Sequence, residues 1–339
     1  MTTVFVSGAT GYIAKHVVQQ LLDKKYKVIG SVRSTEKGEA LARDLNSSDF
    51  SYEIVPDISS KGCFDEALKK HPEVSVFLHT ASPFHFAAQD LEKEMLFPAV
   101  EGTRNALNAI KDHGSQIKNV VVTSSFAAIM NSSPSHPQKE PKYTEESWNL
   151  VTWEEALASP FNAYLASKKF AEEEVWNFVK KEKPQFKLSI VNPAYVFGPQ
   201  LKDADVKGTL NTSAEVINSL LKLKANDQVP DTQGPFTDVR DVAKAHLIAF
   251  ENSDIEGERL LLWEEGFTSQ EVLDIIHKHF SELNDKIPKG TPGSGVKPLG
   301  IDNKTAIDNS KTRKLLGFPF IKLEKSIVDT VAQVLRANK

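Results

Sequence analysis

The sequence predicts an α/β fold built on a parallel sheet, and short apolar runs carry this expectation. Residues 4–6, 27–32 and 76–79 have the length of buried strands, and strands covered on both faces are apolar along most of their length. Segments with helical spacing of apolar residues, at 12–24 and 92–110, alternate with these runs. Such alternation indicates parallel strands joined by right-handed crossovers.

A glycine turn lies between the first strand and the first helix. Glycine lets the backbone turn sharply and approach a pyrophosphate, while the first amides of the helix and its dipole face negative charge. The third small position of the pattern is Ala14, which dinucleotide-binding turns tolerate. The pattern alone is weak, because glycine turns open many helices. The residues expected to border the cofactor are Gly8, Thr10, Gly11, Tyr12 and Ile13.

Composition is that of an ordinary globular protein. The 339 residues are 40% hydrophobic and 25% charged, which suffices for one large domain or two. The net charge of −4 gives no global basic field, so we expect no nucleic-acid partner.

The patterns of cysteine, histidine and hydropathy argue against disulfide-bonded, metal-binding and membrane proteins. The single Cys63 excludes an internal disulfide and a cysteine zinc site. Among the histidines only His277 and His279 lie close together, and their spacing puts them on different helix faces, so no metal is expected. The sequence starts directly in a strand, and no apolar run reaches the roughly 18 residues that span a bilayer. We therefore expect a cytoplasmic protein without membrane contact.

The residue after the second strand indicates which dinucleotide is bound. Enzymes that prefer NAD place a carboxylate there, which accepts hydrogen bonds from the ribose 2′-hydroxyl and repels a 2′-phosphate. Here the residue is Arg33, and Lys37 follows one turn later. A guanidinium matches a phosphate in geometry and charge, so the sequence predicts NADPH/NADP+ as the cofactor. A solvated loop arginine is the alternative.

Two further strand ends carry candidate cofactor contacts. After the third strand, Asp57 is placed to accept from the adenine amino group and Ile58 to cover the ring; helix capping is the alternative for Asp57. Small residues after the strand at 76–79 permit close approach of a cofactor at the carboxyl end of the sheet. They are Thr80, Ala81 and Ser82.

Beyond residue 200 the alternation of strand and helix weakens, which predicts a second, smaller domain. We expect the dinucleotide-binding domain to comprise residues 1–193 and 236–262. The smaller, discontinuous substrate-binding domain would comprise residues 194–235 and 263–339.

Three residues from separate parts of the chain have the chemistry needed to reduce a carbonyl group. Hydride attack produces an alkoxide that must be protonated, and Tyr164 is a proton donor whose anion Lys168 stabilises from one helical turn away. Ser125 is suited to donate a hydrogen bond to the carbonyl oxygen as charge develops, and Ser124 is the competing choice. The alternatives are a surface pair for Tyr164 and Lys168 and a turn or N-cap for the serines.

The motifs occur in a recognisable order along the chain: residues 8–14, Arg33, Asp57, 80–82, 123–125, 164–168, 192–199, 238–243 and 308–311. This ordered set resembles the extended short-chain dehydrogenases/reductases over almost the whole chain. Within that family it is similar to the yeast NADPH-dependent methylglyoxal and aldehyde/ketone reductases, relatives of plant dihydroflavonol reductases.

The resemblance implies a doubly wound Rossmann sheet and a catalytic Ser125, Tyr164 and Lys168. It also implies further cofactor contacts. These are Thr123 at a strand exit, Tyr164 and Lys168 themselves, Pro193, Tyr195 and Val196 beside the nicotinamide, and Ser213 toward the phosphates.

Apolar residues are expected to line the substrate pocket and to select hydrophobic or aryl carbonyls. They are Phe84, Phe126, Met130 and Tyr195, and core packing is the alternative for each aromatic ring. The sequence departs from its resemblance here. Met130 stands where flavonoid reductases carry a polar amide, which argues against a flavonoid substrate, and Phe126 stands where the yeast enzymes carry tyrosine.

The sequence thus predicts an NADPH-dependent carbonyl reductase acting on small aldehydes, ketones or ketoesters, including methylglyoxal and aryl ketones, as a monomer or homodimer. One alternative is an NAD(P)-dependent sugar-nucleotide epimerase or dehydratase. Those enzymes need polar and basic groups for a nucleotide diphosphate, and dehydratases need an acid/base pair beside the serine, which residues 126–128 do not offer. The other is a non-catalytic NADP-sensing protein, against which the intact Tyr164 and Lys168 argue.

Overall fold

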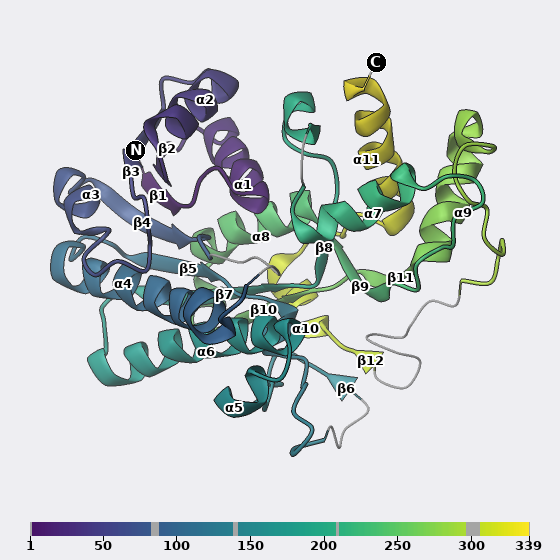
Figure 1. Cartoon of the computed structure of the whole chain (residues 1–339). Helices are drawn as coiled ribbons and strands as arrows, with labels where there is room; N and C mark the ends of the chain where they lie inside the picture. Colours follow the sequence, from purple (N-terminus) through teal and green to yellow (C-terminus); the bar gives the residue numbers. More distant parts are fainter. Residues whose placement is uncertain (1, 83–87, 138–141, 208–209, 296–305, 339) are drawn as a thin grey trace. The chain divides into compact units, whose positions relative to one another are not determined.

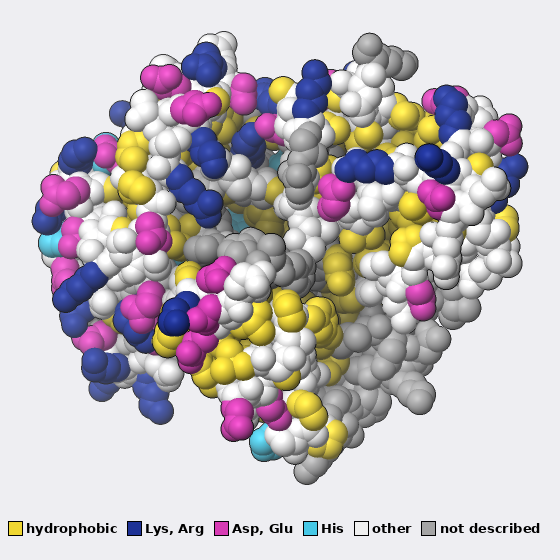
Figure 2. All heavy atoms as spheres, in the orientation of Figure 1, with side chains coloured by type: hydrophobic (Ala, Val, Ile, Leu, Met, Phe, Trp, Pro, Cys, Tyr) yellow, Lys and Arg dark blue, Asp and Glu magenta, His cyan; other side chains and the backbone are white. Residues whose placement is uncertain are grey.

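The computed structural model describes residues 2–82, 88–137, 142–207, 210–295 and 306–338. The chain divides into two compact units. Unit 1 comprises Met1–Lys139, Glu145–Asn192 and Ala243–Leu261, and unit 2 comprises Glu140–Thr144, Pro193–Val242 and Leu262–Lys339. On the face drawn in Figure 2, acidic and basic side chains are interspersed over both units.

A seven-stranded sheet forms the centre of unit 1 and confirms the predicted doubly wound α/β fold (Figure 1). Its order is β10-β7-β5-β4-β1-β2-β3, and the pairs β1–β2, β2–β3, β1–β4, β4–β5 and β5–β7 are parallel. The chain runs outward from β1 in one direction and from β4 in the other, so the switch point, where such sheets bind ligands, lies between these two strands. The strands are β1 (Thr3–Ser7), β2 (Lys27–Val32), β3 (Phe50–Ile54), β4 (Val74–His79), β5 (Asn119–Thr123), β7 (Lys187–Pro193) and β10 (Arg259–Leu262).

Helices cover both faces of this sheet. Helices α3, α4 and α6 pack against one another on one face. Helix α8 ends beside α1, where Glu251 binds Lys24 and Tyr26. The helices of unit 1 are α1 (Tyr12–Asp23), α2 (Thr35–Leu45), α3 (Asp65–Lys70), a π-helical turn (Glu92–Leu96) that leads into α4 (Phe97–His113), α5 (Trp153–Ala156), α6 (Pro160–Glu182), and 3-10 turns at Phe126–Ala128 and Ser253–Ile255. Helix α8 (Val239–Glu251) belongs to unit 1 from Ala243 onward.

The core under α3 and α4 is built from aromatic rings on adjacent strands. Phe5 on β1 stacks on Phe77 of β4 with ring centroids 4.9 Å apart, and the Phe64 ring meets both edge-on. All three side chains are fully buried. Fully burying a phenylalanine contributes roughly 1.5–3 kcal/mol, so this cluster firmly fixes β1 beside β4.

Unit 2 has two small sheets, β11-β9-β8 and β12-β6. Its core is also aromatic, because the rings of Phe197, Phe236 and Phe267 pack together on the first of these sheets. The elements are β6 (Lys142–Tyr143), β8 (Tyr195–Phe197), β9 (Gln233–Asp238), β11 (Glu265–Thr268), β12 (Ala306–Ile307), α7 (Thr212–Lys222), α9 (Ser269–His279), α10 (Ser310–Leu316), α11 (Leu323–Ala337), and 3-10 turns at Asp203–Val206 and Ser281–Leu283.

Several stretches lie in a different unit from the one the sequence suggested. Residues 142–144, 193, 236–242 and 262 were expected in the dinucleotide-binding domain, but they are grouped with unit 2. For residues 142–143 and for the stretch that starts at residue 236 the reason is strand pairing, since β6 pairs with β12, and β9 pairs with β8 and β11 rather than with the large sheet.

Within the described ranges, no helix combines the length and the apolar character that crossing a membrane requires.

Candidate active site

The glycine turn after β1 is held by backbone and serine contacts of β2. The Gly8 amide donates to the Ser31 hydroxyl at 3.0 Å, and the Gly11 amide donates to the Gly8 carbonyl at 2.9 Å. Gly8 has a φ of +66°, and a Cβ added there would lie 3.0 Å from the Ala81 Cβ. Only glycine fits both the dihedral and the space.

The start of α1 fits a phosphate group. Its N-cap is Gly11, which makes no side-chain cap hydrogen bond, and an added Cβ there would meet only the Gly8 carbonyl and Ala14. Thr10, Tyr12 and Ile13 around it are partly exposed. The turn is therefore a backbone cradle with room for an anion at the positive end of a helix.

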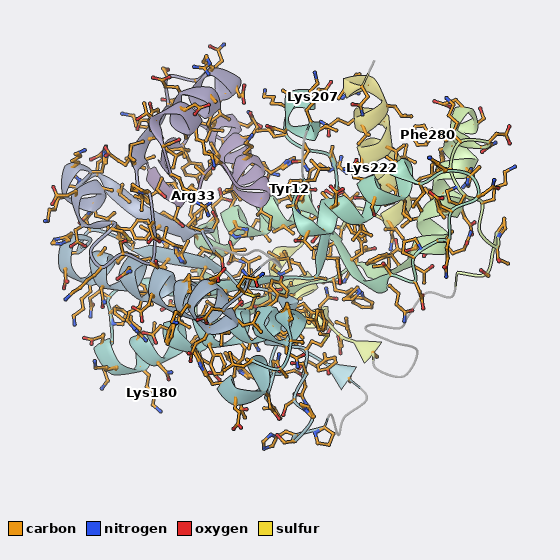
Figure 3. All side chains as sticks on the ribbon, viewed as in Figure 1. Tyr12, Arg33, Lys180, Lys207, Lys222 and Phe280 are labelled. Atoms are coloured by element: carbon orange, nitrogen blue, oxygen red, sulfur yellow. The ribbon has the colours of Figure 1, made fainter. Side chains whose placement is uncertain are left out.

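The second candidate region lies at the ends of β2 and β3. Arg33 is exposed directly after β2, and Lys37 is exposed in the first turn of α2, which Ser34 caps. Figure 3 labels Arg33 there and Tyr12 at the start of α1. These two cations are able to meet a phosphate from solvent without losing an ion-pair partner that the structure records.

Asp57 and Ile58 make contacts that the sequence did not indicate. The Asp57 carboxylate accepts from the amide and hydroxyl of Ser59 at 2.9 and 2.7 Å, which lowers its pKa. It stabilises its own turn and does not cap α3. The Ile58 side chain packs onto α4 at Gly102, where an added Cβ would lie 2.6 Å from the Ile58 Cδ1. Contact of either residue with adenine stays a prediction.

The end of β4 is clamped to β1 by one hydroxyl. The Ser7 Oγ accepts from the amides of Thr80 and Ala81, both at 3.0 Å, and therefore donates its own proton to His79 Nδ1 at 3.0 Å. His79 is buried, and burial followed by the charge of Lys168 lowers its pKa to about 4. His79 is thus neutral at physiological pH, and the clamp sets the position of residues 80–82.

Helix α6 carries Tyr164 and Lys168 on one stripe. Ser159 caps the helix and Pro160 occupies its first turn, which places the start of the helix as expected for these residue types. The Lys168 Nζ donates to the Ser82 Oγ at 2.8 Å and lies 5.9 Å from the centre of the Tyr164 ring. Burial lowers the pKa of Lys168 to about 8. A cation so placed stabilises a phenolate more strongly than it would in water.

The structure distinguishes the two serines after β5. The Ser124 hydroxyl is buried and donates to Glu172 Oε2 at 2.5 Å. Ser125 is partly exposed, and its Oγ accepts from the Ala127 amide at 3.1 Å as the N-cap of the following 3-10 turn. The Ser125 hydroxyl thus keeps its proton to donate, which favours Ser125 over Ser124 for the catalytic role.

The other predicted residues lie at or after the end of β5, outside the described ranges, or in unit 2. The Thr123 hydroxyl pairs with His246 Nε2 at 2.6 Å, while Phe126 is buried and Met130 is half-buried after the same strand. Phe84 lies outside the described residues. The remaining ones are in unit 2 and are described within it alone: Pro193 at the end of β7, Tyr195 and Val196 on β8, and Ser213 in the first turn of α7.

Tyr195 has an aromatic environment of its own in unit 2. Its ring meets Phe267 edge-on at 5.4 Å, and burial raises the pKa of its hydroxyl. Gly234 lies against the ring, since an added Cβ would be 3.0 Å from the Tyr195 Cε2.

Three buried polar residues near the site were missed from the sequence: His79, Glu172 and Arg259. Glu172 follows Tyr164 and Lys168 at the same four-residue spacing, so the helical stripe itself was a signal that could have found it. His79 and Arg259 sit inside or beside apolar strand segments, where a lone polar residue indicates a paired interior group.

Among the residues that the structure describes, no group of three or more His, Cys, Asp or Glu is arranged to hold a metal ion. His277 and His279 have separate partners, Asn284 and Pro288 for the first and Glu324 for the second.

A parallel sheet with a glycine turn at its switch point, Ser125 after β5, and Tyr164 and Lys168 on α6 is the arrangement expected of a dinucleotide-dependent oxidoreductase. Residues 4–261 match the NAD dependent epimerase/dehydratase family, and the chain belongs to that family.

Full-length relatives come from yeasts. The chain is 55% identical to a putative NADPH-dependent methylglyoxal reductase of Candida albicans and 47% identical to the NADPH-dependent methylglyoxal reductase of Saccharomyces cerevisiae, with 98% of each chain covered in both cases. The crystal structure of Gre2 from Candida albicans in complex with NADPH is 51% identical, with a TM-score of 0.95 over 100% of both chains.

The hydrogen bond from Lys168 to Ser82 leads to a prediction about pH. In Ser82→Ala the ammonium loses its acceptor, so the charged form of Lys168 is less stable and its pKa moves further below about 8. A hydrogen bond to a charged group contributes roughly 1.5–3 kcal/mol, and one pKa unit corresponds to about 1.4 kcal/mol. The basic limb of the pH profile, where kcat/KM falls at high pH, should therefore shift to lower pH by about one unit. Ser51→Ala, at an exposed position on β3, should leave the limb in place. An unchanged limb in Ser82→Ala would contradict the assigned role.

The exposed Arg33 leads to a prediction about coenzyme choice. Arg33→Ala should lower kcat/KM for NADPH by about 10- to 100-fold, the equivalent of one charge-assisted hydrogen bond, with little change for NADH. Arg43→Ala on the outer part of α2 is the matched control, since Arg43 is exposed and, within the described ranges, its recorded ion pair is with Glu39 at 3.9 Å. Equal turnover of NADH and NADPH by the parent protein would refute the assignment.

Proposed function

We propose that this protein reduces small aldehydes, ketones or ketoesters with NADPH, and that Tyr164 donates the proton. It is an NADPH-dependent oxidoreductase, since relatives with 47–55% identity over their full length are named NADPH-dependent methylglyoxal reductases. The observation that carries the catalytic assignment is the half-buried Lys168, one turn from Tyr164, with its ammonium on the Ser82 hydroxyl.

The residues of unit 1 fit the cofactor. Gly8 leaves no room for a side chain against Ala81, and Gly11 begins α1 without a side-chain cap, which is the cradle that a pyrophosphate requires. Arg33 and Lys37 would hold the 2′-phosphate, and Lys168 the nicotinamide ribose. When bound, NADPH supplies the hydride.

Three residues of the chain act in the proposed reaction. The Ser125 hydroxyl donates to the carbonyl oxygen and stabilises charge as it develops there. The Tyr164 hydroxyl then transfers its proton to the same oxygen, a step that general acids accelerate by about 10² to 10⁴-fold. Lys168 stabilises the phenolate that remains, and solvent returns a proton to it. With NADP+ the same groups support alcohol oxidation.

The substrate class is the finer part of the proposal. Small carbonyl compounds are favoured, because the relatives are methylglyoxal reductases by name. Phe126, Met130 and Tyr195 would favour apolar or aryl carbonyl compounds over charged sugars. We further propose a cytoplasmic enzyme that is a monomer or homodimer and binds neither nucleic acid nor membrane.

The two alternatives find less support. A sugar-nucleotide dehydratase needs an acid/base pair beside the catalytic serine, and the next residues are Phe126, Ala127 and Ala128, all buried. A non-catalytic NADP sensor has no need for the contact between Lys168 and Ser82.

The decisive experiment is a screen of NADPH oxidation with methylglyoxal, an aryl ketone and a β-ketoester. Conversion of a nucleotide sugar is followed separately by chromatography of the products, because epimerisation and dehydration consume no net NADPH. Turnover with at least one simple carbonyl compound, and none with the nucleotide sugar, is expected. Turnover of the nucleotide sugar alone would overturn the proposal, and kcat/KM would rank the accepted substrates.

The role of Tyr164 can be tested directly. Tyr164→Phe removes only the hydroxyl, and kcat should fall by about 10² to 10⁴-fold, the usual contribution of a general acid. Tyr52→Phe, on β3 against Gly38, should keep the parent rate, and near-ultraviolet circular dichroism would check that both variants fold. A Tyr164→Phe protein that turns over near the parent rate would exclude proton donation by this residue.

A further inference from the structure

The carboxylate of Glu172 is a charge buried in the middle of unit 1. The residue is 1% exposed and lies on α6 four residues after Lys168 and eight after Tyr164, on the same stripe of the helix. A buried carboxylate is costly unless hydrogen bonds and a countercharge surround it.

Groups from four places in the chain meet this carboxylate. Oε2 accepts from the Ser124 hydroxyl at 2.5 Å and from Asn192 Nδ2 at 2.7 Å. Oε1 accepts from Arg259 Nε at 2.6 Å and from Trp176 Nε1 at 3.3 Å. The exit of β5, the end of β7, the start of β10 and α6 itself are thereby joined at one point.

One of these donors, Asn192, also holds the backbone of Ser125, and the backbone of the neighbouring Ser124 is held by β7. Asn192 Nδ2 donates to the Ser125 carbonyl at 3.2 Å, and the Ser124 amide donates to the Val191 carbonyl at 2.8 Å. The Ser125 backbone is therefore tied to Glu172 through its neighbour and through Asn192, while its side chain remains at the partly exposed edge.

The Arg259 guanidinium, which is the countercharge of Glu172, is also held by contacts to residues 145–148. Arg259 is 6% exposed, its guanidinium lies 4.1 Å above the Trp148 ring, and Nη1 donates to the carbonyls of Glu145 and Ser147. The pair Glu172–Arg259 thus cannot shift along the sheet without breaking contacts to the segment at 145–148.

We propose that Glu172 is a positioning residue, which fixes the serine turn against α6 so that Ser125 and Tyr164 address the same substrate oxygen. This role rests on the proposed function, because it has a purpose only if Ser125 and Tyr164 act on the same substrate oxygen. Glu172 itself takes no part in proton transfer and acts through Ser124 and Asn192.

Ser124→Ala is the sharpest test, because it removes one of the four contacts and leaves the ion pair with Arg259 intact. Displacing a reacting group by about 1 Å costs about 100-fold in rate, so we expect kcat to fall by about 10- to 100-fold. The KM for the carbonyl substrate and the Kd for NADPH, followed by its fluorescence, should stay within about twofold.

The matched control is Ser189→Ala. Ser189 is also a buried serine of the same sheet, and its hydroxyl donates to the backbone carbonyls of Ile255 and Ala249 at 3.0 and 3.4 Å. A purely structural loss should lower the melting temperature of both variants and leave kcat near the parent value in both. A selective loss of kcat in Ser124→Ala supports the positioning role, and equal kcat in the two variants overturns it.

Glu172→Gln provides a second measurement. It should lower kcat at least as far as Ser124→Ala does, and the double variant should be no slower than Glu172→Gln, because both changes break the same link. Additive losses would overturn the shared link. A parent protein without carbonyl turnover would overturn the proposed function and this role with it, whereas an active parent with an unaffected Ser124→Ala variant would overturn this role alone.

Discussion

The pairing of β1 with β4 is the constraint on which the candidate site depends. Their register sets Ser7 opposite His79, and the aromatic packing of Phe5 on Phe77 fixes it. From this register the Ser7 hydroxyl reaches the amides of residues 80 and 81. The pairing of β1 with β4 therefore places both the glycine turn and residues 80–82, where Ser82 accepts the hydrogen bond from Lys168. A shift of this register by one residue would turn the side chains of the shifted strand to the opposite face of the sheet.

Electrostatics in the interior follow from how each buried group is satisfied. His79 remains neutral because the Ser7 proton occupies its Nδ1 and burial disfavours a charge. The Glu172 carboxylate accepts hydrogen bonds from Arg259 and from three neutral donors. Lys168 is less well compensated than Glu172, since the Ser82 hydroxyl is its one recorded acceptor in the described part of the chain. Burial therefore lowers its pKa to about 8.

The fold and much of the site could be predicted from the sequence, because short-range patterns report them. Apolar runs indicated the strands, and the four-residue spacing of Tyr164 and Lys168 indicated one helical face. Long-range partners could not be predicted. Nothing local shows that Ser124 faces Glu172 while Ser125 faces outward, because that choice depends on β7 and β10 supplying Asn192 and Arg259. Residues 236–242 were assigned to the other unit for the same reason, since strand order is a property of the whole sheet. The roles of the predicted cofactor and pocket residues remain predictions.

The exposure of Arg33 and Lys37 has a consequence for how this protein can evolve. Exposed side chains outside special features can usually be exchanged within about 0.5 kcal/mol of stability, whereas the groups around Glu172 and His79 are interlocked. If Arg33 and Lys37 hold the 2′-phosphate as we propose, coenzyme preference depends on exposed residues that can be exchanged at little cost in stability, whereas substitutions around Glu172 and His79 would disturb the packed interior.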